Sequence, residues 1–184
     1  MPILGQGWEF LVVRASVQRR NSDGRRRTIG KYQVFRDGVR QTGAGMKGTT
    51  AEAKGPGANI PINNGKRIEQ GRYPLLTHAP GHYATIGFSA SVDPDAEPKP
   101  SIEVGETVER TDILIHPGDG FLSSIGCINL CTMLPDANEP IDYAPSRKRV
   151  IAVLENLKDF LGNEFPTRNG KPIPNAFLVV DGEP

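Results

Sequence analysis

Two side chains near the middle of this chain are of types that perform acyl-transfer chemistry, and they lie eleven positions apart. His116 ends a short apolar run, and Cys127 follows directly after Gly126. A cysteine attacks a carbonyl as the thiolate, and a nearby histidine favours this form by taking the proton. Gly126 leaves room for a carbonyl, and the N–H groups beside it suit a developing oxyanion. The spacing predicts a cysteine nucleophile, Cys127, with His116 as its base.

Each residue alone has an ordinary interpretation, because a single cysteine is commonly a small buried apolar side chain. The combination of Cys127 and His116 with Ser124 and Gly126 at fixed offsets favours catalysis over packing. A papain-like protease fits less well, since that class places its cysteine before its histidine. All three histidines of this chain precede Cys127. Cys131, four residues further on, is expected to pack in the core.

The composition predicts one domain, residues 1–184, of a mainly β class with a few helices. The chain has 21 glycines and 16 prolines, which favour short strands and tight turns. It has 22 basic and 21 acidic residues, which gives no electrostatic reason to expect nucleic acid. No apolar run is long enough for a membrane span, and the N-terminus does not resemble a secretory signal. Two cysteines with these histidine spacings predict no metal, and no cofactor is expected.

The expected elements are strands and one clear helix. Residues 145–161 have an apolar helical face, with Ser146 as the expected N-cap and Gly162 just past the end. A short helix is expected to begin at Cys127, where its N-terminus would favour the thiolate. The arginines near residues 19–27 are expected to surround a solvated hairpin turn. Strands are expected at 9–18, 28–36, 72–77, 83–89, 111–116 and 176–180, with long loops at 43–66 and 91–100.

The segment around Cys127 resembles the active-site motif of L,D-transpeptidases of the YkuD type. That motif is a histidine, a variable loop, then Ser/Thr-His-Gly-Cys, a hydrophobic residue and Asn/Arg. Here His116 matches the first histidine. Ile125 stands where the family usually has a second histidine, and the loop after His116 is short. With these departures the segment resembles divergent members of the family. Those members include peptidoglycan-targeting effectors of type VI secretion and phage relatives. The other matching positions are Ser124, Gly126, Cys127, Ile128 and Asn129, and a weaker match lies at 71–75.

The resemblance implies a β-sandwich with a C-terminal helix and an attack of Cys127 on peptidoglycan stem peptides. The attacked bond would join a diamino acid to D-alanine, and water or an amine would resolve the thioester. Ser124 and Asn129 would hold the substrate or His116, and Arg72 would bind a carboxylate. His82 would line the cleft or belong to an ordinary turn. Asp119 would orient His116 or serve only as a turn residue.

The resemblance also implies a place of action and partners. The protein would be made in the cytoplasm and act in the periplasm or cell wall after delivery by a route other than Sec. A delivery protein or an immunity protein would then be a partner. The alternative hypothesis is a non-catalytic protein on the same scaffold, a structural or wall-binding component of a phage or a secretion apparatus.

Overall fold

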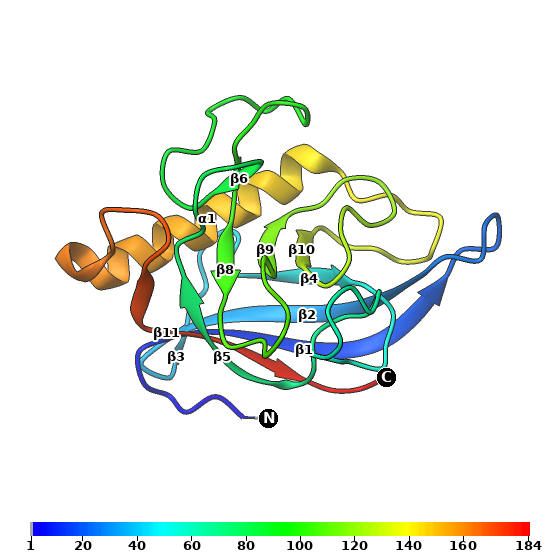
Figure 1. The fold of residues 1–184 in the computed structure, drawn as a ribbon, viewed down its shortest axis with the longest axis horizontal. Helices are drawn as coiled ribbons and strands as arrows, with labels where there is room; N and C mark the ends of the chain where they lie inside the picture. Colours follow the sequence, from blue (N-terminus) through cyan, green and yellow to red (C-terminus); the bar gives the residue numbers. More distant parts are fainter. Residues whose placement is uncertain (1) are drawn as a thin grey trace.

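The computed structural model describes residues 2–184 as a mainly β fold with one long helix, which confirms the predicted class (Figure 1). The helix α1 spans Tyr143–Leu161, and a 3-10 turn, η1, follows at Gly162–Glu164. The strands are β1 (Trp8–Arg19), β2 (Arg26–Arg36), β3 (Val39–Arg40), β4 (Lys47–Glu52), β5 (Gly71–Leu76), β6 (Tyr83–Ala84), β7 (Lys99–Pro100), β8 (Ile102–Val104), β9 (Leu114–Pro117), β10 (Ile128–Cys131) and β11 (Pro172–Asp181).

The main sheet closes on itself as a barrel. Its strand order is β1-β11-β5-β8-β9-β10-β4-β2, and β2 pairs back with β1. β3 extends β2 outside this closed path, and β6 and β7 form a separate small sheet. The two-layer sandwich that the resemblance implies is not confirmed, because the strands form one continuous ladder. Closure leaves the ends of the strands, where loops meet, as the places for a site.

The hairpin of β1 and β2 supplies one wall of the core. Trp8, Phe10 and Val12 alternate inward along β1 and are fully buried, as the period of a strand requires. The ring of Phe10 stacks on that of Tyr32 from β2, with centroids 5.0 Å apart. The predicted strands and the arginine-flanked turn between them are confirmed.

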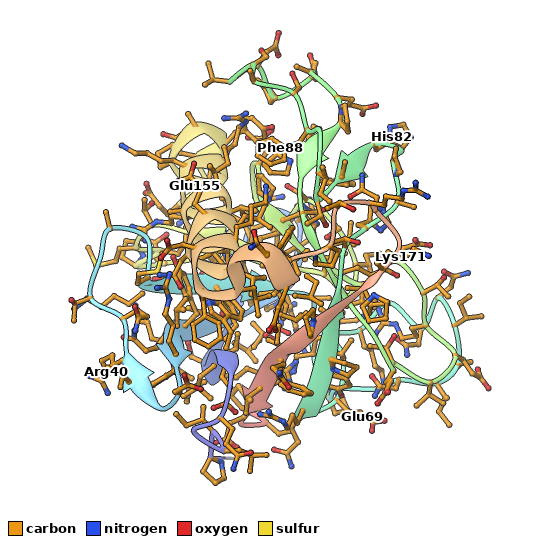
Figure 2. The ribbon with its side chains drawn as sticks, turned by 90° about the vertical axis from the view of Figure 1, so that its left-hand side faces the viewer. Arg40, Glu69, His82, Phe88, Glu155 and Lys171 are labelled. Carbon is orange, nitrogen blue, oxygen red and sulfur yellow. The ribbon has the colours of Figure 1, made fainter. Side chains whose placement is uncertain are left out.

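The helix α1 lies across the strands and covers the core with one apolar face (Figures 1 and 2). Its buried aliphatic residues recur at helical spacing: Val150, Val153, Leu154, Leu157 and Leu161. Gly162 ends it at a φ of 53°, as predicted. The predicted N-cap was wrong, because Asp142 caps the helix by accepting from the N–H of Ala144 at 3.2 Å. Ser146 lies one turn inside.

Two predicted elements were wrong, and a third is much shorter than predicted. The predicted loop 43–66 contains β4, which pairs with β2 and β10 through a Gly-Thr-Thr-Ala sequence without apolar alternation. The segment after Cys127 is the strand β10, not a helix. All four residues of β10 are buried, and a strand buried on both faces loses the alternation that distinguishes it from a helix. The predicted strand 83–89 is a strand only at Tyr83–Ala84.

Candidate active site

The strands β9 and β10 are parallel neighbours and place the candidate residues side by side. His116 on β9 is in register with Asn129 on β10. The loop between the two strands carries Ser124 and ends at Cys127, immediately before β10. Residues distant by up to thirteen positions thus meet at one end of the strand pair, as the sequence motif predicts.

The imidazole of His116 is fully buried and its tautomer is set by the backbone. Its Nδ1 lies 2.7 Å from the carbonyl oxygen of Pro117, and a carbonyl only accepts, so Nδ1 carries the hydrogen. Nε2 is left as the acceptor. The hydroxyl of Ser124 donates to it at 2.9 Å and the amide nitrogen of Asn129 lies 3.3 Å away. His116 therefore presents a basic nitrogen toward Ser124.

The sulfur of Cys127 has three polar neighbours. It accepts from the N–H of Leu114 at 3.4 Å and lies 3.6 Å from the carbonyl of Asp112, to which the thiol donates. The hydroxyl of Ser124 also interacts with it and favours the thiolate. In the resting site the Ser124 hydroxyl donates to Nε2 of His116, and Ser124 lies three residues before Cys127 on the same loop.

Burial keeps both partners of the predicted pair uncharged in the resting site. It lowers the pKa of His116 to about 4, and it raises the pKa of the Cys127 thiol. The Ser124 hydroxyl, the Leu114 N–H and the Arg110 guanidinium oppose that rise. The predicted help from a helix N-terminus is absent, because Cys127 precedes a strand. Proton transfer must then accompany attack on a substrate.

Gly126 has a φ of +100°, a conformation that side chains rarely adopt. A Cβ at this position would overlap the guanidinium of Arg110, which lies against the backbone here. Arg110 is only 6% exposed and donates to the carbonyl of Ala58 at 3.0 Å. The glycine predicted beside the nucleophile is thus needed both for its φ and for this close approach.

Two further residues of the site, Arg110 and Tyr83, were not predicted from the sequence. The ring of Tyr83 lies 4.6 Å from that of His116, and burial raises the pKa of Tyr83 to about 12. Neither residue belongs to the motif segment: Tyr83 lies on β6 in the separate small sheet, and Arg110 lies in the connection between β8 and β9. A short motif contains no signal for such residues.

Three of the predicted site residues make their contacts elsewhere. Arg72 pairs with Glu9 and lies over the ring of Phe177. His82 is exposed and its Nδ1 is 2.6 Å from Glu97. Asp119 is exposed and its N–H donates to the hydroxyl of Ser123, while the carbonyl of Pro117 orients His116.

The second cysteine lies apart from the contacts of Cys127, whereas a group of metal-ligating side chains includes Asp112, whose backbone carbonyl accepts from the Cys127 thiol. Cys131 is fully buried in a small apolar cluster, as predicted. In residues 2–184, one His/Asp/Glu group, His78, Glu103 and Asp112, has ligating atoms within 4.8 Å of one another. The 3.0 Å contact of His78 with Glu103 already satisfies both side chains without an ion.

Neither a scan against models of protein families nor searches for similar curated proteins and solved structures gave a match. None of the helices in residues 2–184 has the length and apolar character needed to cross a membrane.

Proposed function

We propose that the protein is a cysteine acyltransferase or hydrolase that acts on peptidoglycan stem peptides, as an L,D-transpeptidase or L,D-carboxypeptidase. The observation that carries the proposal is the pair of hydrogen bonds on His116, whose Nδ1 is held by the Pro117 carbonyl and whose Nε2 accepts from Ser124, on the loop that ends at Cys127. A nucleophile, a base and a group that orients the base are the parts that acyl transfer needs.

In the proposed mechanism, the Cys127 thiol turns from the Asp112 carbonyl to the Ser124 hydroxyl. Ser124 passes its own hydrogen to Nε2 of His116 and takes the thiol proton while the sulfur attacks the carbonyl. The Pro117 carbonyl stabilises the imidazolium, since it accepts from Nδ1. The N–H groups of Gly126 and Cys127 stabilise the oxyanion. The C–N bond then breaks, and the leaving amine takes the proton from His116. Water or an amine cleaves the resulting thioester.

The substrate follows from the resemblance of the segment from Ser124 to Asn129, with His116, to the L,D-transpeptidase motif. The bond would join the diamino acid to D-alanine. Ile125 replaces the usual second histidine of that motif, so the proposed enzyme is a divergent member of the type found among antibacterial secreted effectors. It would act in the periplasm or cell wall after delivery that does not use Sec.

The test is mass spectrometry of muropeptides incubated with the protein. The wild type is expected to remove or exchange the terminal D-alanine or to form new cross-links, and Cys127→Ala is expected to abolish all three. Cys131→Ala is the matched control, because Cys131 is buried apart from the site and should leave the products unchanged. Equal product yields from the wild type and Cys127→Ala would refute the proposal.

A second candidate is a non-catalytic wall-binding or structural protein on the same scaffold. Two observations favour it: Cys127 is only 6% exposed, and burial raises the pKa of its thiol. It predicts that a small alkylating reagent leaves Cys127 unmodified near neutral pH and that the muropeptides are unchanged. Rapid alkylation that Ser124→Ala slows would instead favour the enzyme.

A further inference from the structure

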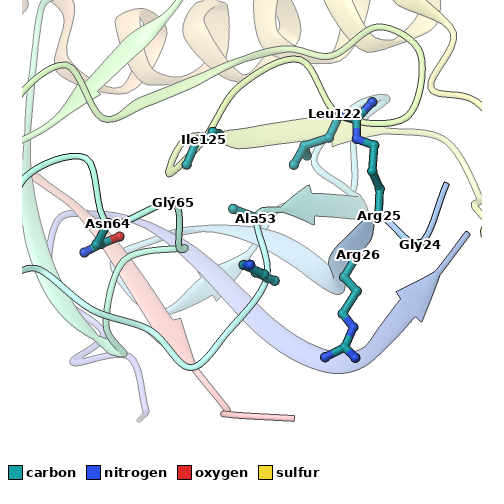
Figure 3. A pocket seen from close by; sticks show the side chains of 9 residues that line it. Gly24, Arg25, Arg26, Ala53, Asn64, Gly65, Leu122 and Ile125 are labelled. Atoms are coloured by element: carbon teal, nitrogen blue, oxygen red, sulfur yellow. The ribbon is translucent and has the colours of Figure 1, made fainter.

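Two hollows lie on either side of Ile125 and share it as a wall. One, of about 430 Å³, is lined by Arg25, Arg26 and Lys54, with Leu122, Ala53 and Gly65 among its other walls (Figure 3). The other, of about 420 Å³, is lined by Arg110, Asp112 and Ile113, and it shares Gly65 as well as Ile125. The two hollows therefore adjoin at Ile125 and Gly65.

The second hollow opens beside the nucleophile. The carbonyl of Asp112 accepts from the Cys127 thiol, and Arg110 lies against Gly126. Ile113 would also contact a Cβ at Gly126. A molecule whose carbonyl reaches Cys127 from this side would extend over Ile125, whose side chain is 64% exposed. An exposed apolar ridge between two hollows suits the apolar part of a bound chain.

The first hollow is rich in unpaired positive charge. In the described chain, Arg25, Arg26 and Lys54 form no ion pair. Arg25 is held over the ring of Phe121, 5.0 Å from its centroid. Glu183 lines a neighbouring hollow with Arg26 and Lys54, but its carboxylate is already paired with Arg14 and Arg67. Asp23 lies near Arg25 and interacts with its charge, so Arg26 and Lys54 are the cations of this hollow that have no paired carboxylate in the described chain.

We infer that the two hollows form one substrate groove, in which a peptide with free carboxylates lies with its reacting carbonyl at Cys127 and its carboxylates at Arg26 and Lys54. This inference rests on the proposed function and deepens it. The basic hairpin, which the sequence presents as a solvated turn, becomes the part of the groove that selects acidic peptides over their amidated forms. Ile125 becomes the apolar ridge between the two parts.

Binding is tested with Cys127→Ala, which cannot form the thioester, and two fluorescent stem tetrapeptides that differ only in having free carboxylates or carboxamides. The free acid is expected to bind about 3- to 10-fold more tightly in fluorescence anisotropy at low salt, as two exposed ion pairs would give. Added salt should reduce the difference. Arg26→Gln/Lys54→Gln should abolish it.

The matched control is Arg40→Gln/Lys171→Gln, which removes the same charge from exposed cations on other parts of the surface (Figure 2). It should keep the preference for the free acid. Equal binding of the two peptides, an equal loss in both double variants, or equally strong competition by a short oligonucleotide would overturn the groove.

The muropeptide assay separates this inference from the proposed function. Processing of both peptides at equal rates would refute the proposed groove but would still support the proposed enzymatic function. If the free acid binds selectively but the wild type does not process it, the proposed enzymatic function is refuted. The groove would then be a binding site for acidic peptides. Absence of both binding and processing would refute both.

Discussion

At the scale of single residues, the buried imidazole of His116 makes stability depend on pH. Burial lowers its pKa in the folded protein to about 4 from the ordinary value of 6.5. The unfolded chain therefore binds a proton below about pH 6.5 that the folded protein does not take until about pH 4. The stabilisation is fully present above pH 6.5 and is lost as the pH falls through this window, by up to about 3 kcal/mol.

Urea unfolding of the wild type and His116→Gln between pH 7.5 and about 4 measures this effect. The free energy of unfolding should fall more steeply with decreasing pH in the wild type than in His116→Gln. His82→Gln is the control, because the His82 ring is exposed. Parallel pH profiles for the wild type and His116→Gln would contradict the assignment of a buried neutral imidazole.

Gly126→Ala is expected to impair both stability and activity. The added Cβ would overlap the Arg110 guanidinium, and the φ of +100° is one that side chains rarely adopt. The backbone strain should lower the free energy of unfolding by about 1–3 kcal/mol, and the N–H groups that stabilise the oxyanion should move. Gly120→Ala is the matched control, since Gly120 also has a positive φ, +62°, but has open space around it. Thermal unfolding should show a loss of stability in both variants. The muropeptide assay should show a loss of activity only for Gly126→Ala. Normal activity of Gly126→Ala would contradict this role.

The site contains residues that a short sequence motif predicts and residues that only the folded structure reveals. His116, Ser124, Cys127 and Asn129 lie in one segment, and the structure brings them together as the motif predicts. Tyr83 and Arg110 come from other segments, and their contacts with His116 and Gly126 depend on the tertiary structure, which the motif does not encode. Arg72 was predicted from a weak match and lies with Glu9 instead.

At the scale of elements, Ser146 joins the helix to the strands that carry the site. Its hydroxyl accepts from the N–H of Gly118, at 2.8 Å, and donates to the carbonyl of Leu130 on β10. The residue is fully buried. The sequence predicted it as a cap because Ser before a helical pattern usually has that role, but here the hydroxyl satisfies groups of a neighbouring turn and strand.

Ser146→Ala should therefore destabilise the protein by about 1–3 kcal/mol, because it leaves two buried backbone groups without a partner. Chemical denaturation measures the change. Ser22→Ala, in the exposed hairpin turn, is the control and should be close to neutral. A neutral Ser146→Ala variant would show that water replaces the hydroxyl.

The elements whose apolar residues alternate or recur were predicted well, and the others were not. β1, β2 and α1 have clear patterns and lie close to their predicted ranges, and β11 contains its predicted range but begins four residues earlier. β4 has small polar residues, and its strand conformation depends on pairing with both β2 and β10. β10 is buried on every residue. The closed sheet around β4 and β10 determines their strand conformation, so a short stretch of sequence does not reveal it.

At the scale of the whole molecule, a buried ionic cluster ties the first strand to the end of the chain. Arg14 on β1 donates to Glu52 on β4 at 2.7 and 2.9 Å, and both side chains are fully buried. Glu183 near the C-terminus accepts from Arg14 and from Arg67. The cluster thus connects segments that are far apart in the sequence.

Glu52→Gln is expected to destabilise the protein by about 3 kcal/mol, because it removes the fully buried partner of Arg14 and leaves only the partly exposed Glu183 to compensate the charge. Glu183→Gln is the comparison, and its effect should be smaller because the Glu183 side chain is 34% exposed. Denaturant unfolding of the two variants gives the difference. Equal losses would contradict the inference that burial sets the cost.

The parallel pairing of β9 with β10 has a consequence for protein engineering. His116 and Asn129 are held in register by the ladder, and Cys127 directly precedes that ladder. The intervening loop is itself anchored, because Gly120 exchanges two backbone hydrogen bonds with Ile141 and the buried Phe121 accepts from Arg27. Substituting only the exposed Ile125 would therefore give a set of variants with one reaction centre and different entrances.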